Sequence, residues 1–69
     1  MNVFEAKRLA EETVSKQQNN SSGVIYWVLV QMGQALICNN FRTAMENAAG
    51  CYVFSVRFVN GEAVATLQG

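Results

Sequence analysis

The dipeptide Asn60-Gly61 constrains the fold more than any other feature, because it separates two stretches of alternating apolar residues. Both residues of a two-residue hairpin loop usually need positive φ, and Asn-Gly accepts it readily. The dipeptide therefore predicts a β-hairpin with strands over Cys51–Val59 and Glu62–Leu67. A two-residue loop also sets the register. The expected cross-strand pairs are Phe58 with Ala63, Val56 with Ala65, Phe54 with Leu67, Val59 with Glu62, Arg57 with Val64 and Ser55 with Thr66.

A second hairpin is predicted earlier in the chain. Val24–Gln31 is rich in β-branched and aromatic residues, and Met32-Gly33 is typical of a turn. Ala35–Cys38 is expected to return as the partner strand. The expected cross-strand pairs are Val30 with Ala35, Val28 with Ile37, Trp27 with Cys38 and Leu29 with Leu36.

Two helices complete the predicted elements. The first runs over Val3–Gln17, with Asn2 as N-cap and Glu5 three residues later. The second follows the candidate N-caps Asn39 and Asn40, and Gly50 ends it. Its apolar residues recur at helical spacing at Phe41, Ala44, Met45, Ala48 and Ala49. The order α-β-β-α-β-β predicts one α+β domain over residues 1–69, with a four-stranded antiparallel sheet and both helices mainly on one face.

Composition indicates that this domain does not function alone. Of its 69 residues, 51% are hydrophobic and only 14% are charged. A domain of this length has a small core and cannot bury so many apolar side chains by itself. Self-association or a surface for a partner is therefore expected.

One face of the predicted sheet carries the excess apolar residues. The first strand is apolar on both sides, and such a strand expects cover on both sides. If both helices lie on the other face, this face is left for a homodimer or another protein. The alternatives are that one helix covers each face or that the sheet coils around Trp27. The candidate interface residues are Ile25, Trp27, Leu29, Leu36, Cys38, Val59 and Val64.

The residue types argue against catalysis and against a metal or cofactor. Histidine and aspartate are absent, and the five glutamates fall at positions expected to face solvent. Cys38 and Cys51 alone do not make a zinc site, and no cationic neighbour activates either thiol. We therefore expect neither an enzyme nor a cofactor-binding protein.

The charge pattern limits the kind of partner that is expected, and the apolar runs limit the expected location of the protein. The net charge is zero, and the five basic residues do not gather beyond the pair Lys7-Arg8, which disfavours nucleic acid. The run Val24–Val30 is too short to span a bilayer. No secretory signal pattern precedes it, so the cytoplasm is the expected location, with reduced thiols.

Three functions remain open. The first is a small inhibitor or regulator that binds another protein, in analogy of size alone with inhibitors encoded by phages and other mobile elements. The second is a nucleic-acid binder in which Tyr26, Phe54 and Phe58 stack on bases and Arg57 supplies the cation, if the helices leave them uncovered. The third is a purely structural assembly subunit.

Overall fold

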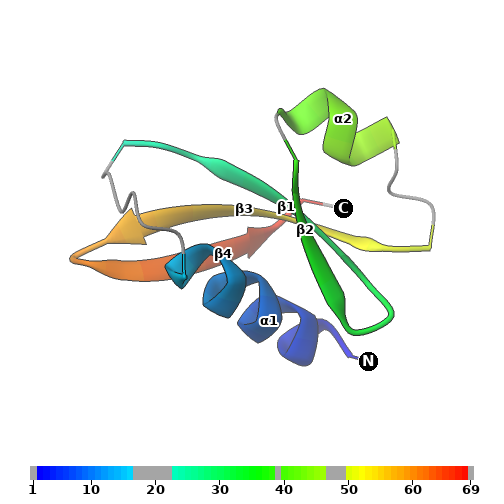
Figure 1. Cartoon of the computed structure of the whole chain (residues 1–69), viewed down its shortest axis with the longest axis horizontal. Coiled ribbons are helices and arrows are strands. Elements are labelled where there is room, and N and C mark those ends of the chain that lie inside the picture. Colours follow the sequence, from blue (N-terminus) through cyan, green and yellow to red (C-terminus); the bar gives the residue numbers. More distant parts are fainter. Residues whose placement is uncertain (1, 17–22, 39, 47–49, 69) are drawn as a thin grey trace.

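A computed structural model of the chain describes residues 2–16, 23–38, 40–46 and 50–68. The sheet is antiparallel throughout, with strand order β2-β1-β3-β4 (Figure 1). The fold is thus the predicted α+β arrangement in the predicted order. Its elements are α1 (Val3–Ser15), β1 (Tyr26–Gln31), β2 (Gln34–Cys38), α2 (Phe41–Glu46), β3 (Tyr52–Val59) and β4 (Glu62–Leu67).

Both predicted hairpins and their registers are confirmed. Met32 and Gly33 have φ of 50° and 81°, and Asn60 and Gly61 have φ of 52° and 82°. These positive values are those of two-residue hairpin loops. Every cross-strand pair expected from the sequence is observed in β1–β2 and β3–β4. The two hairpins join through β1 and β3, whose pairing places Val28 opposite Phe54.

The main core lies between α1 and one face of the sheet. Ala6, Ala10 and Val14 fall on one side of α1 and are fully buried. Asn2 caps the helix, since its Oδ1 accepts from the backbone N–H of Glu5 at 2.9 Å. From the sheet, the core receives the buried side chains of Val28, Val30, Phe54, Val56, Phe58 and Ala65.

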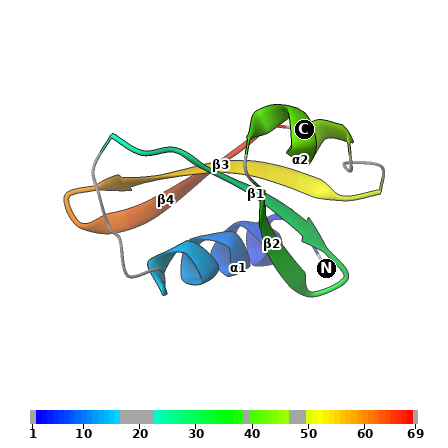
Figure 2. The same cartoon turned by 45° about the horizontal axis from the view of Figure 1, so that its top comes forward.

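The second helix packs on the opposite face, which differs from the expected placement of both helices mainly on one side. Figure 2 shows α1 and α2 on either side of the sheet. Ala44 of α2 is fully buried against Leu29 and Val53, which point away from the α1 core. The alternative of one helix on each face is therefore the one observed. The reason is that Leu29 and Val53 need apolar cover and α2 follows β2 after a short connection.

Smaller differences occur at the element ends. β1 begins at Tyr26 instead of Val24, β2 begins at Gln34 instead of Ala35, and β3 begins at Tyr52 instead of Cys51. Gly50 has the expected positive φ of 75°. The predicted ends of both helices, at Gln17 and Ala49, lie outside the described residues.

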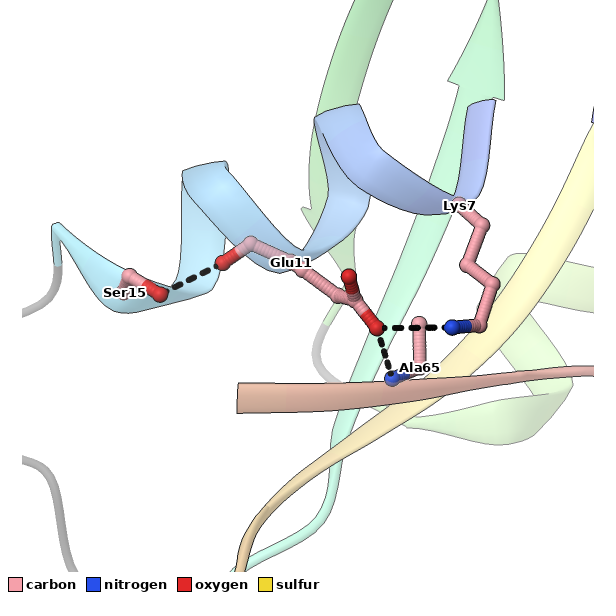
Figure 3. A network of polar contacts seen from close by, with 4 residues as sticks. All are labelled: Lys7, Glu11, Ser15 and Ala65. Atoms are coloured by element: carbon pink, nitrogen blue, oxygen red, sulfur yellow. Dashed lines mark hydrogen bonds and ion pairs between the residues drawn. The ribbon is translucent and has the colours of Figure 1, made fainter. Parts of the chain in front are cut away.

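The β4 edge of the sheet is partly covered by a side chain from α1. Glu11 Oε2 accepts the backbone N–H of Ala65 at 2.9 Å and forms an ion pair with Lys7 Nζ at 3.1 Å (Figure 3). In a two-residue hairpin the pairing alternates, so the N–H of Ala65 points away from β3. Glu11 thus satisfies an edge group that would otherwise be open to another strand.

Candidate interaction surface

The centre of the predicted interface is covered by α2. The rings of Trp27 and Phe41 lie 4.9 Å apart at a tilt of 58°. Leu29 is buried, and Trp27 and Cys38 are half-buried beside it. These three residues therefore form a second, smaller core with α2, and they are not the open centre of a patch.

α2 is capped at its start. Asn40 Oδ1 accepts the backbone N–H of Thr43 at 2.8 Å, as expected of an N-cap. Phe41 remains 44% exposed and Met45 39% exposed, so only Ala44 is fully buried in the described part of the helix. The helix thus covers its side of the sheet only in part.

Two separate groups of the predicted residues stay exposed on the α2 side. The first lies at the end of the sheet formed by the start of β1 and the β3–β4 turn, and consists of Ile25, Val59 and Val64. The second is Leu36 on the edge strand β2, 59% exposed, with the turn residue Met32 beyond it. Leu36 and Met32 line a shallow depression together with Leu29, Gln31 and Gln34.

Arg57 lies in the middle of the first group. It is exposed, it pairs across strands with Val64, and alternation puts it on the same face as Val59. Ile25 directly precedes Tyr26, which pairs with Val56, so it lies at the end of β1 nearest Arg57. We call Ile25, Arg57, Val59 and Val64 the Arg57 surface.

The guanidinium of Arg57 has no ionic partner within the part of the chain that the structure describes. The ion pairs found there are Lys7–Glu11, Arg8–Glu12 and Arg42–Glu46, each between residues four apart on one helix. Glu62 is exposed on β4 at the border of the Arg57 surface. An unpaired arginine among apolar side chains can form a charge-assisted hydrogen bond with a carboxylate of a partner.

The predicted register places Arg57 opposite Val64, but the sequence predicts a role for Arg57 only in the nucleic-acid alternative. The register was the signal that could have singled it out, since it shows one cation between apolar neighbours on a single face. The predicted interface has Trp27 at its centre instead, because a central tryptophan is typical of interfaces.

The aromatic residues of the nucleic-acid alternative lie on the α1 side. Phe54 is fully buried, Phe58 is 7% exposed, and Tyr26 packs edge-on against Phe58 with ring centroids 6.2 Å apart. Stacking on bases needs an accessible ring face. Phe54 and Phe58 therefore offer no accessible ring face, and Tyr26 is half-buried beside Phe58.

Both cysteines are thiols next to the smaller core. Within the described ranges, no helix has the length and hydropathy needed to cross a membrane.

No protein-family model, curated protein or solved structure matches the chain.

Proposed function

We propose that the chain is a non-enzymatic module that binds another protein through the Arg57 surface and thereby inhibits or regulates it. The observation that supports this proposal is the exposed Arg57, which has no ionic partner among the described residues, with Ile25, Val59 and Val64 around it. Apolar contact supplies the affinity of such a surface, and the arginine selects the partner by charge.

The side chains of the Arg57 surface indicate which residue types a partner presents to it. A fitting protein presents an aspartate or glutamate flanked by apolar side chains, so that its carboxylate meets the guanidinium of Arg57. Arginine and aromatic residues dominate the energetics of interfaces of this kind. Glu62 at the border disfavours a partner with an acidic rim on that side.

The location and the self-association of the protein are also proposals. We propose a cytoplasmic location, where Cys38 and Cys51 remain reduced. We also propose self-association, because the apolar excess of the sequence is only partly buried: Ile25, Leu36 and Val64 are all more than a third exposed.

A charge reversal with a matched control tests the proposal. Tagged wild-type protein, Arg57→Glu and Arg42→Glu are purified under mild conditions from the cells that make the protein, and the accompanying proteins are identified by mass spectrometry. Arg42 is the control because it is also an exposed arginine and lies outside the surface, on α2.

We expect at least one protein to accompany the wild type and Arg42→Glu but not Arg57→Glu. Circular dichroism establishes that both variants are folded. The same set of proteins with all three baits would contradict the proposal.

A further inference from the structure

The two edges of the sheet differ. On β4, the outward N–H of Ala65 donates a hydrogen bond to the carboxylate of Glu11. On β2, the register set by the two-residue loop directs the backbone N–H and C=O groups of Ala35 and Ile37 outward, away from β1. Among the described residues, neither the outward N–H groups nor the outward carbonyl oxygens of these two residues have a hydrogen-bond partner. The β2 edge is therefore open.

β2 also lacks the features that prevent strands from pairing at an edge. Gln34–Cys38 contains no charge, no proline and no bulge, and its register with β1 is unbroken. Soluble proteins usually protect an open edge with such features or cover it. An edge that has neither is suited to bind another strand.

The spacing of the outward N–H and C=O groups on β2 allows it to pair with a second copy of the same strand. Leu36 is the middle residue of β2, and Ala35 and Ile37 lie on either side of it. A two-fold axis at Leu36 pairs all five residues, with Ala35 of each copy opposite Ile37 of the other. This arrangement forms about four backbone hydrogen bonds. No charged residue of β2 meets its own copy, so no like-charge repulsion opposes the pairing.

The exposed side chain at the centre completes the match. Leu36 is 59% exposed, and at the axis it takes the position without hydrogen bonds, where opposite side chains are closest. Each Leu36 then buries its apolar surface against the other copy.

We propose that two copies of this chain associate through antiparallel pairing of their β2 strands about Leu36, which makes one continuous eight-stranded sheet. The homodimer expected from the sequence is thereby placed at a sheet edge and away from the Arg57 surface. The inference gives the proposed self-association a location, and it is independent of partner binding by the Arg57 surface, since it uses a different surface. A contact of one strand pair is small, so the dimer is expected to be weak and to depend on concentration.

Amide exchange measured by NMR tests the pairing directly on the wild-type protein. As concentration rises, light scattering should show the mass increasing towards twice 7.6 kDa. The amides of Ala35 and Ile37 should then exchange more slowly in proportion to the loss of monomer. Ala63 is the control, because its N–H points outward from β4 at the other edge. A mass that stays at 7.6 kDa, or a dimer in which Ala35 and Ile37 exchange as before, overturns the proposal.

Matched lysine substitutions locate the contact. Leu36→Lys should abolish the rise in mass, because two like charges meet at the axis. Val64→Lys, an exposed position on the other edge strand within the Arg57 surface, should leave the rise unchanged. The opposite result would place the dimer on the Arg57 surface and overturn the pairing of β2. Because only Val64 belongs to the surface of the proposed function, failure of the two proposals is distinguishable.

Discussion

At the scale of single residues, Glu11 has a role that its position on a helix does not suggest. It is one of three glutamates in a helix with regular ion pairs, yet its carboxylate binds the backbone of β4. The side chain of Glu11 is 25% exposed, compared with 58% for Glu12. A partly buried carboxylate that accepts a backbone N–H contributes more to stability than an exposed ion pair.

Removal of this carboxylate should therefore destabilise the fold. We expect Glu11→Ala to lower the free energy of unfolding by about 1–2 kcal/mol, because the N–H of Ala65 loses its acceptor. Glu12→Ala, which removes only the exposed contact to Arg8, should change it by less than about 0.5 kcal/mol. Urea denaturation followed by circular dichroism measures both values. Equal effects of the two substitutions would show that the contact between Glu11 and β4 contributes no stability.

Arg57 should behave in the opposite way. Since its side chain is exposed and has no ionic partner in the described structure, we expect Arg57→Glu to change the free energy of unfolding by less than about 0.5 kcal/mol. The same denaturation experiment measures this value. A loss as large as that of Glu11→Ala would mean that Arg57 stabilises the domain, and its assignment to a binding surface would lose its basis.

At the scale of elements, the hairpins were predictable and the position of α2 was not. Met32-Gly33 and Asn60-Gly61 are two-residue loops, which determine the strand register and hence which side chains share a face. The apolar spacing of α2 defines a helix but carries no information on which face it covers. Trp27 was therefore predicted correctly as opposite Cys38, while its cover by Phe41 depends on a contact that local patterns do not encode.

The contact between Trp27 and Phe41 should hold α2 on its face of the sheet. A double-mutant cycle with Trp27→Leu and Phe41→Leu should give a coupling free energy of about 0.5–1.5 kcal/mol, as tilted aromatic pairs do. The control cycle combines Trp27→Leu with Phe4→Leu, since Phe4 is 79% exposed on α1. The control should be additive. Additive effects in the first cycle too would contradict the packing of α2 on Trp27.

At the scale of the whole molecule, this small chain with a high apolar content leaves part of its apolar surface uncovered. α1 covers one face of the sheet, and α2 covers the centre of the other. This leaves the Arg57 surface at one end and the edge strand β2 at the other side of the sheet. The sequence predicted a single apolar interface here, and the helix that divides it explains why two smaller surfaces remain.

Photo-crosslinking from Val64 tests directly whether the Arg57 surface binds another protein. A photoreactive amino acid replaces Val64 in the cells that make the protein, and the control carries it at Phe4, an exposed position on α1. We predict a covalent adduct with a different protein from position 64 only, and its loss when Arg57→Glu is added. No adduct from position 64, or one that persists with Arg57→Glu, would contradict the assignment of this surface to partner binding.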